Sequence, residues 1–496
     1  MTRDATLAPA SAGSAGDPAP GSPGCALHAD LQARFRTQQR SFAADSFPPA
    51  TVRRDRLERM RRLVAGNEQR LAQAISDDFG HRSVHETVIA ETFFVLAGIA
   101  HARRHLTRWM KQRRVGTALH SLPGASSILP QPLGVVGVVS PWNYPLQLAL
   151  APAVAALAAG NRVMIKPSEL TPRLSRLLAE LVADAFTPDE CTVVTGGADT
   201  GRDFAALPFD HLFFTGSTAV GRQVALAAAA NLTPVTLELG GKSPAIIDER
   251  CDVVDAARKI AAGKLFNAGQ TCIAPDYVLL PHRLQQPFAD AYVQAVAELY
   301  PTLEGNPDYT SIVDDRHHAR LRRLSEDARA GGARVVEINP GGEPQRDGSR
   351  KMRPQLLLQV SPGMAVMQEE IFGPLLPLVP CDGTAQALAF VNERPRPLAL
   401  YWFGRDRSRA QEVLRSTVCG GVTINDVLLH IAQENLPFGG VGASGSGAYH
   451  GEWGFRLFSK EKPVFEQSRL AATALLRPPY GRRAAAVIDA LKRLLT

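Results

Sequence analysis

Cysteine is scarce in this chain of 496 residues, which holds six, with no regular spacing and no CxxC pair. Disulfide frameworks and structural zinc sites both need several cysteines at short spacings. We therefore predict neither a disulfide framework nor a metal site. The reducing cytoplasm is the compartment that fits best.

Long apolar runs are also missing. No stretch of about twenty apolar residues could serve as a transmembrane helix. Residues 1–29 are rich in Ala, Gly, Pro and Ser and lack the continuous apolar segment of a secretory signal. We expect them to form a disordered extension, and we expect no export.

The charge balance is basic, at +7, and basic residues crowd the segment 101–114. RNA-binding segments interleave aromatic and basic residues, and that arrangement is absent from this segment. We favour a solvated helix face there and expect no nucleic-acid partner. A positive field would also attract an anionic cofactor.

The chain does have ample apolar sequence, 45% of its residues, which is enough to fill two or three domains. Residues 31–114 carry apolar positions at three- and four-residue spacing, which predicts a mostly helical opening layer. Further on, strand-like and helical patterns alternate, with strands at 133–140, 162–166, 191–195, 211–215 and 235–239 and helices at 146–159, 174–185 and 219–230. This alternation predicts an α/β fold with a parallel sheet that binds ligands at the carboxyl ends of its strands.

A second alternating set runs from about residue 240 to 425, with strands expected at 245–248, 277–280 and 375–379. It predicts a second α/β domain.

The chain ends in a predicted amphipathic helix with basic flanks, whose apolar face carries Ala484, Val487, Ile488, Leu491 and Leu495. Such a helix can make weak contact with a membrane surface. Docking on the protein's own body or on a partner subunit is the interpretation that we favour.

Cys272 is the one cysteine in a chemically suggestive setting, because Gly269-Gln270-Thr271-Cys272 forms a short turn between a helical pattern and a strand. The other five cysteines are typical of small buried or idle thiols. Upstream, Glu238 lies alone in the segment LELGGK. A thiolate that attacks a carbonyl and a carboxylate that later activates water form a coherent pair. We expect a depressed pKa for the Cys272 thiol.

Asn143 lies in the segment PWNYP directly after a predicted strand. The two prolines stiffen the loop, so the amide could act as the fixed donor of an oxyanion hole. By itself, an asparagine in such a loop is more often a turn residue.

Two strand ends suggest a dinucleotide. Lys166 and Glu169 could hold the two hydroxyls of an adenosine ribose, where an acid favours NAD over NADP. Taken alone, the same segment fits a surface strand end with a helix cap at Ser168 equally well. Gly216, Ser217 and Gly221 open a helix that suits a pyrophosphate, although their spacing is not GxGxxG and a simple helix cap would look the same.

Glu370 and Phe372, in the segment EEIFGP, add a carboxylate and an aromatic ring. Each is ambiguous alone, because the acid could be a solvated charge and the ring a core residue.

Seven segments, in the order PWNYP, KPSE, FTGS, LELGGKSP, GQTC, EEIFGP and LPFGG, resemble the NAD(P)-dependent aldehyde dehydrogenase superfamily. The resemblance extends from about residue 31 to the carboxyl end. GQTCIAPDYV, PLALYWF, TINDVLLH and GSGAYHGEWGF are similar to its class 3 branch. FGHRSVHET, LLHIAQENLPFGG and LLRPPYG resemble the bacterial coniferyl aldehyde dehydrogenases.

This resemblance implies that Cys272 is the nucleophile, Glu238 the general base and Asn143 the oxyanion donor. It assigns cofactor binding to Trp142, Lys166, Glu169, Gly216, Ser217, Gly221, Leu239, Glu370 and Phe372. The implied reaction oxidises an aromatic or aliphatic aldehyde to the acid through a thiohemiacetal and a thioester. The implied cofactor is NAD, with NADP left open.

The resemblance also implies a homodimer and a division of the chain. A Rossmann-like cofactor domain would span 30–239, interrupted near 116–133 by bridging strands, and a catalytic domain would span 240–425. Residues 426–470 would return to the cofactor domain and the bridging element, and 471–496 would form the tail. The segment 442–447 and Trp402 depart from many relatives, away from the catalytic residues.

Two rival functions remain open. A dehydrogenase that transfers the acyl group to coenzyme A instead of to water would use the same cysteine. Relatives of that kind commonly lack a glutamate at the position of Glu238. A catalytically silent binding or structural protein could keep the same fold.

Overall fold

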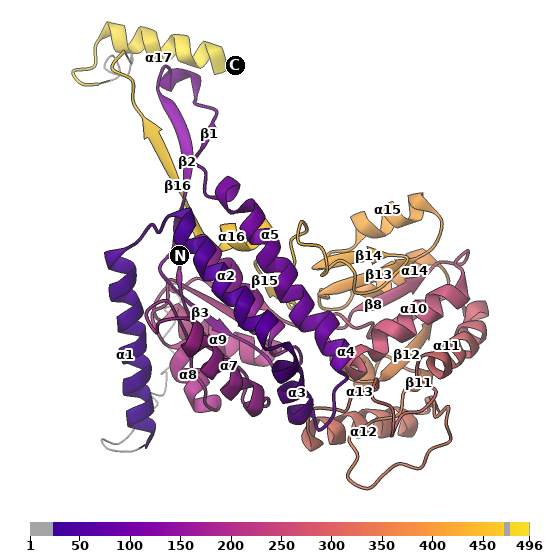
Figure 1. Ribbon diagram of the computed structural model, residues 1–496. Coiled ribbons are helices and arrows are strands. Elements are labelled where there is room, and N and C mark those ends of the chain that lie inside the picture. The colour runs from indigo at the N-terminus through magenta and orange to yellow at the C-terminus, as the bar shows by residue number, and fades with distance from the viewer. Residues whose placement is uncertain (1–22, 471–476, 496) are drawn as a thin grey trace, which may run out of the picture.

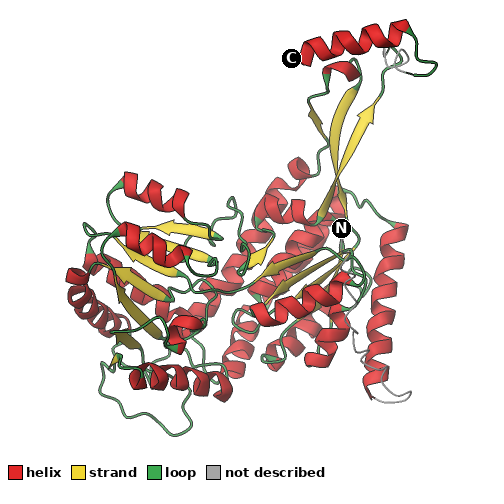
Figure 2. Cartoon of the chain, turned by 180° about the vertical axis from the view of Figure 1, so that it is seen from behind, coloured by secondary structure: helices red, strands yellow, loops and turns green. Residues whose placement is uncertain are grey.

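The computed structural model describes residues 23–470 and 477–495. Two α/β bodies lie side by side, and an arm of antiparallel strands projects from them with the last helix at its tip (Figure 1). Figure 2 shows from behind that helices cover the sheets of both bodies. The predicted α/β class is confirmed.

The opening layer is helical, as predicted. It contains α1 (Pro23–Ala44), α2 (Ala50–Gly66), α3 (Glu68–Phe79), α4 (Val84–Thr87), the π-helical η1 (Val88–Thr92) and α5 (Phe93–Trp109). Two boundaries were predicted wrongly. Residues 23–29 are helical rather than disordered, because α1 packs against the body through buried Leu31 and Phe35. The helical pattern stops at Trp109, and Arg113 and Arg114 belong to a strand. The rest of the predicted extension, residues 1–22, lies outside the described part of the chain.

The first body is built on a six-stranded sheet of order β15-β7-β6-β3-β4-β5, parallel except for β15. Its strands are β3 (Val135–Val139), β4 (Arg162–Lys166), β5 (Cys191–Val193), β6 (His211–Thr215), β7 (Val235–Glu238) and β15 (Gly445–Ser446). The connecting helices are α6 (Gln147–Ala159), α7 (Pro172–Ala185), α8 (Ala198–Ala205) and α9 (Thr218–Ala229).

The second body is built on a seven-stranded sheet of order β10-β11-β12-β9-β8-β13-β14, in which β10 is antiparallel. Its strands are β8 (Pro244–Ile247), β9 (Tyr277–Leu280), β10 (Arg334–Glu337), β11 (Gln355–Leu358), β12 (Leu375–Pro380), β13 (Ala399–Phe403) and β14 (Gly421–Ile424). Its helices are α10 (Val253–Leu265), α11 (Gln285–Leu299), α12 (Asp315–Ala330), α13 (Ala365–Gln368), α14 (Thr384–Asn392) and α15 (Arg407–Ser416).

Helix α6 lies inside the first body, where it packs against α2, α5, α16 and β4. Almost all of its residues are buried, which is the pattern of a helix covered on every side. One apolar cluster includes residues of both sheets, such as Val138 and Val278. The two bodies therefore hold their facing loops in a fixed relation.

The arm consists of β1 (Arg113–Val115), β2 (Ala125–Pro132) and β16 (Ser459–Glu466), all antiparallel, with β2 in the middle. Helix α16 (Gly451–Leu457) leads into β16, and α17 (Arg482–Leu495) follows it. Figure 1 shows α17 at the tip of the arm, away from both sheets. The predicted tail of 471–496 is helical from Arg482, and residues 471–476 and 496 lie outside the described part.

Among the described helices, none is by itself long and apolar enough to cross a membrane. One bent pair, Glu68–Phe79 with Val84–Trp109, meets that criterion of length and composition only when its members are taken together.

Candidate active site

Cys272 follows a turn of unusual backbone conformation at the end of α10. Asn267, Ala268 and Gly269 have φ values of 53°, 52° and 77°, so three consecutive residues are left-handed. A Cβ on Gly269 would lie 2.4 Å from the carbonyl oxygen of Gly373, so a larger side chain does not fit. Residues other than glycine rarely adopt a left-handed conformation, because their β-carbon makes it costly. Backbone strain of this kind is concentrated in functional loops.

Buried polar contacts hold this turn. The Asn267 backbone N–H donates to Glu86 Oε1 at 3.0 Å. Gln270 Nε2 donates to the carbonyls of Asn267 and Ser311, both at 3.0 Å, and its Oε1 accepts from Val313 N–H at 2.9 Å. The turn is thereby tied to the helical layer on one side and to the second body on the other.

Asn143 lies beside this turn. Its side-chain Nδ2 donates to the Gln270 carbonyl at 3.2 Å, and its own carbonyl accepts from Arg82 Nη1 at 2.9 Å and from Asn267 Nδ2 at 3.0 Å. Arg82 is fully buried and forms an ion pair of 2.8 Å with the equally buried Glu91. The position of the Asn143 amide is therefore determined by several independent contacts.

Glu238 ends β7 and is 1% exposed. Neither of its carboxyl oxygens has a hydrogen-bond partner among the described residues. Burial, with the nearby charge of Glu370, raises the pKa of Glu238 to about 8. A carboxyl group with such a pKa can accept and release a proton near neutral pH.

The predicted depression of the Cys272 thiol pKa is wrong for this arrangement of groups. Burial, followed by the charges of Glu238 and Glu370, raises the thiol pKa well above its ordinary value. The backbone N–H groups of Cys272 and Ile273 act in the opposite direction but are weaker. The sequence could not show that two carboxyl groups, rather than a cation, face the sulfur.

A pocket of about 490 Å³ brings most of the predicted site residues together. The ones that line it are Trp142, Asn143, Gly216, Ser217, Glu238, Leu239, Cys272, Glu370 and Phe372. Three predicted residues, Lys166, Glu169 and Gly221, are not part of its lining. Sequence reasoning missed His317 and Arg320 of α12, which line the same pocket but belong to no recognisable motif.

The aromatic side of this pocket is ordered by ring contacts. Trp142 lies edge-on to His317, with ring centroids 4.9 Å apart, and to Phe372, at 5.4 Å. Phe372 has a φ of 54°, a conformation that is costly for an aromatic residue and marks a functional constraint.

The pocket fits a dinucleotide. Ser217 caps α9, where its hydroxyl accepts from Val220 N–H at 3.4 Å, and it lines the pocket together with Ala219, so the start of this helix faces the pocket and suits a pyrophosphate. Gly221 lies inside α9, where a Cβ would come within 2.7 Å of the Leu239 side chain, so its role is close packing. Glu370 Oε1 accepts from Gly241 N–H at 3.1 Å.

At the neighbouring strand end, Lys166 and Glu169 form a pair. The Lys166 Nζ donates to the Pro167 carbonyl at 2.8 Å and lies 3.5 Å from the Glu169 carboxylate. The lysine is 3% and the acid 50% exposed, which leaves the carboxylate available to a sugar hydroxyl.

A second pocket, of about 350 Å³ and almost entirely apolar, reaches Cys272 from the other side. Its walls come from η1, the first turn of α5, the start of α6, α10 and the loop 426–432. Both pockets share Leu148 and Cys272. The sulfur therefore lies where the larger cleft, which carries the acids and Arg320, meets the apolar tunnel. The sequence did not predict this tunnel, because its residues are scattered along the chain.

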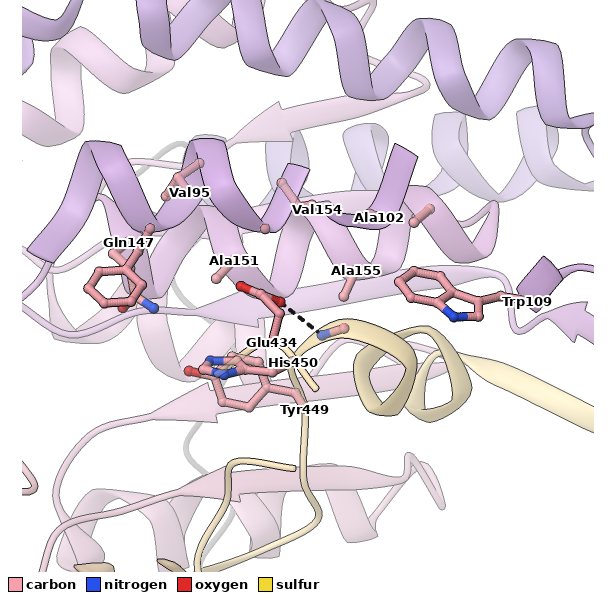
Figure 3. Close-up of a pocket in the computed structure, with 14 residues that line it drawn as sticks. Val95, Ala102, Trp109, Gln147, Ala151, Val154, Ala155, Glu434, Tyr449 and His450 are labelled. Carbon is pink, nitrogen blue, oxygen red and sulfur yellow. Dashed lines mark hydrogen bonds between the residues drawn. The ribbon is translucent and has the colours of Figure 1, made fainter. Parts of the chain in front are cut away.

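A third cavity lies behind the tunnel and shares Phe94 and Gln147 with it. At about 30 Å³ it has room for a single water. Figure 3 shows Glu434 reaching toward α5 and α6, with His450 and Tyr449 below it, and its carboxylate accepts from Gly451 N–H at 3.1 Å. These polar groups support the tunnel wall rather than line the first pocket.

The aldehyde dehydrogenase family model matches residues 25–464. The chain belongs to the aldehyde dehydrogenase family. The matched part includes both sheets and the arm up to residue 464 of β16, and it stops before α17. The resemblance seen in the seven sequence motifs is thereby confirmed.

Several relatives share about half of their residues with this enzyme. A "Probable coniferyl aldehyde dehydrogenase" of Pseudomonas aeruginosa is 51% identical, over 91% of this chain and 94% of the relative. A "Coniferyl aldehyde dehydrogenase" of a Pseudomonas species is 49% identical, over 87% and 89%. The "Aldehyde dehydrogenase family 3 member A2" of Pongo abelii is 40% identical, over 90% and 91%, in agreement with the class 3 branch.

Solved structures agree in fold. The "Substrate bound state of Staphylococcus Aureus AldH" superposes with a TM-score of 0.88 at 37% identity, covering 93% of this chain and 99% of that one. An "NAD+ complex structure of aldehyde dehydrogenase from bacillus cereus" has a TM-score of 0.80 at 25% identity, covering 89% of each chain. The enzyme oxidises an aldehyde to the carboxylic acid and uses NAD(P).

Proposed function

We propose that the enzyme oxidises an extended aromatic aldehyde of the coniferyl type to its acid, with Cys272 as nucleophile. The observation that carries this proposal is the position of Cys272 at the meeting point of the dinucleotide cleft and the apolar tunnel. A flat apolar substrate suits the tunnel, and the relatives of about 50% identity are named coniferyl aldehyde dehydrogenases. A medium- or long-chain aliphatic aldehyde is the second candidate, because it would suit the same walls.

The Cys272 sulfur adds to the aldehyde carbon and forms a C–S bond. The carbonyl oxygen becomes an oxyanion that accepts hydrogen bonds from Asn143 Nδ2 and from the backbone N–H of Cys272. The thiol proton passes to Glu370, one of the two carboxyl groups whose charges act on the sulfur, so Glu238 stays a carboxylate for the later water step.

NAD(P) supplies the acceptor for the hydride that the substrate carbon loses. Collapse of the oxyanion leaves a thioester on Cys272. Glu238 then removes a proton from a water molecule that attacks the acyl carbon, so the C–S bond breaks and the acid leaves. No other acid with two unpartnered oxygens lies in this pocket among the described residues.

One panel of aldehydes tests the proposal: coniferyl aldehyde, cinnamaldehyde, benzaldehyde and decanal, each with NAD and with NADP. We expect the highest kcat/KM for coniferyl aldehyde and a preference for NAD, because Glu169 would repel a 2′-phosphate. Cys272→Ala should abolish oxidation of every aldehyde, and wild-type turnover in this variant would exclude Cys272 as nucleophile. A best kcat/KM with decanal would replace the aromatic substrate by the aliphatic one.

Transfer of the acyl group to coenzyme A is disfavoured by Glu238, which stands ready to activate water. Adding coenzyme A to the assay separates the two outcomes. We expect free acid as the product, and accumulation of acyl-CoA would favour the transferase.

The proposed enzyme is a cytoplasmic homodimer. Cys191, Cys251, Cys272, Cys381 and Cys419 are free thiols, as in a reducing compartment. The arm exposes Leu119, Leu122 and Phe465, and its outer strand β16 pairs only with β2 among the described residues, which leaves an open edge for a second copy. Light scattering in solution and cell fractionation test these two statements.

A further inference from the structure

The apolar tunnel carries a charged pair at a distance from Cys272. Among the described residues that line it, Lys259 and Asp426 are the only charged ones. Lys259, Ala262, Gly263 and Phe266 follow one face of α10 and its extension, and Phe266 begins the turn that carries Cys272. Lys259 precedes Phe266 by two helical turns, which is about 10 Å along the axis.

The Lys259 ammonium is held in place but keeps one free donor. Its Nζ donates to the Asp255 carboxylate at 2.7 Å and to the Asn425 carbonyl at 3.0 Å. An ammonium has three N–H donors, and the third has no partner among the described residues. The side chain is 32% exposed, so it lies at the mouth of the tunnel rather than in its interior.

Asp426 offers the matching acceptor. It precedes the apolar loop residues of the tunnel, and its Oδ1 accepts from the Val427 N–H at 2.8 Å. Its Oδ2 accepts no hydrogen bond from a described residue. The tunnel mouth therefore presents one N–H donor and one carboxylate acceptor beside otherwise apolar walls.

We propose that Lys259 and Asp426 select the substrate by its distal end, binding the phenolic hydroxyl of a 4-hydroxycinnamaldehyde whose carbonyl carbon reaches Cys272. A phenolic hydroxyl both donates and accepts a hydrogen bond, and this pair supplies one partner for each role. The conjugated chain keeps such an aldehyde straight, so its two ends are separated by a fixed distance. This inference rests on the proposed function and names the group that determines substrate choice within it.

The test compares kcat/KM for 4-hydroxycinnamaldehyde and cinnamaldehyde, which differ only in that hydroxyl. We expect the wild type to prefer the hydroxylated aldehyde by about tenfold, the effect of one hydrogen bond to a charged group. In Lys259→Met and in Asp426→Asn the ratio should fall toward one, mainly through KM, because the contact is equal in ground and transition states. An unchanged ratio in both variants would overturn the inference.

Two further variants separate recognition from structure. Arg258→Met, on the neighbouring position and bonded to Glu298 outside the tunnel, should leave the ratio unchanged. Asp255→Asn removes the ion pair but keeps the ammonium, so the preference should persist. If Lys259→Met lowers the rates of both aldehydes equally, the lysine only supports the loop, and the inference is wrong.

The shorter 4-hydroxybenzaldehyde tests whether the distance between the aldehyde and the hydroxyl matters. Its hydroxyl stops short of the tunnel mouth, so Lys259→Met should not alter its kcat/KM, and an equal loss with the short aldehyde would contradict the placement. A wild type that oxidises none of these aldehydes refutes the proposed function itself. A wild-type enzyme that oxidises 4-hydroxycinnamaldehyde and cinnamaldehyde equally well leaves the proposed function standing and refutes only the selection by Lys259 and Asp426.

Discussion

At the scale of single residues, the site depends on carboxyl groups that the fold keeps out of water. Glu238 has no hydrogen-bond partner among the described residues and a raised pKa, a state that costs stability and provides a base near neutral pH. Glu370 accepts one hydrogen bond, from Gly241 N–H, and its pKa is likewise raised to about 8, by burial and then by Asp276.

Glu238→Gln should leave an initial burst of NADH and make the following steady turnover at least a hundredfold slower, since only water attack needs the base. In the wild type the base works as a carboxylate, so steady turnover should rise with pH up to about 8 and level off above it. The glutamine variant should lose this rise. Stopped-flow and steady-state NADH absorbance from pH 6 to 9 measure both phases. Undiminished steady turnover of the glutamine variant would exclude Glu238 as the base. Loss of the burst in this variant would show that Glu238 also accepts the thiol proton.

Arg82 acts on the site through another residue. It bonds to the Asn143 carbonyl and pairs with Glu91, which accepts from the Leu146 and Gln147 N–H groups at the start of α6. Arg82→Met leaves Glu91 buried without its cation, so we expect a loss of about 3–5 kcal/mol in the free energy of unfolding.

The double variant Arg82→Met/Glu91→Gln removes the uncompensated charge and should regain much of that stability. It should keep a reduced kcat with little change in KM, because the Asn143 loop still lacks its anchor. Urea denaturation and aldehyde kinetics on the three proteins check this. A double variant with wild-type kcat would show that Arg82 serves stability alone.

The residues that sequence alone could assign are those that lie within short motifs. Asn143, Glu238 and Cys272 were predicted separately and meet in one pocket. Arg82, His317 and Lys259 were not predicted, because Arg82 comes from the short connection between α3 and α4 and the other two come from helices, and none of them lies in a recognisable motif. The raised thiol pKa was missed for a related reason, since it depends on which side chains face the sulfur in space.

At the scale of elements, strands were easier to predict than helix ends. The strand predicted at 162–166 has those bounds in the structure, because its buried apolar centre, Val163 to Ile165, is flanked by one basic residue at each end. The start of α1 at Pro23 and the end of α5 at Trp109 depend on packing against distant segments, which a local pattern does not contain.

The loop before α16 carries a prediction about pH. Burial raises the pKa of Glu434, which bonds to Gly451 N–H and lies against Gly98 of α5, where a Cβ would come within 3.2 Å of its Oε1. In the unfolded chain this acid loses its proton at lower pH than in the fold. The free energy of unfolding should therefore fall as pH rises through the interval between the two pKa values.

Glu434→Gln keeps the oxygen that accepts from Gly451 and cannot ionise. We expect its urea midpoint to exceed that of the wild type at pH 8 and to approach it at pH 4.5. The matched control is Glu412→Gln, an exposed acid on α15, which should show no such difference. A Glu434→Gln protein less stable than wild type at pH 8 would contradict the assignment.

At the scale of the whole molecule, the two sheets determine what lies on each side of the cysteine. The strand ends of the first sheet, together with α12 and the loop 369–372 of the second body, provide the dinucleotide cleft. Helix α10 of the second body, with η1 and α5, provides the tunnel. The alternation of strands and helices predicted both bodies, and the motif order predicted one site between them. The tunnel depends on long-range packing, so no local pattern could show it.

The arm and α17 carry the last prediction. Ile488 is 39% exposed, and the basic residues Arg482 and Arg483 begin the helix at the tip of the arm, where it lies away from both sheets. An amphipathic helix with a half-exposed apolar face is stable only if another surface covers that face. We expect this surface to belong to a second copy of the chain.

Ile488→Asp should then shift the protein from dimer toward monomer in light scattering at micromolar concentration. Ala486→Asp, on the opposite face of the same helix, should leave the dimer intact. Flotation with anionic lipid vesicles tests the membrane alternative, and binding of the wild type but not of Ile488→Asp, with an unchanged dimer in both, would assign the helix to the lipid surface.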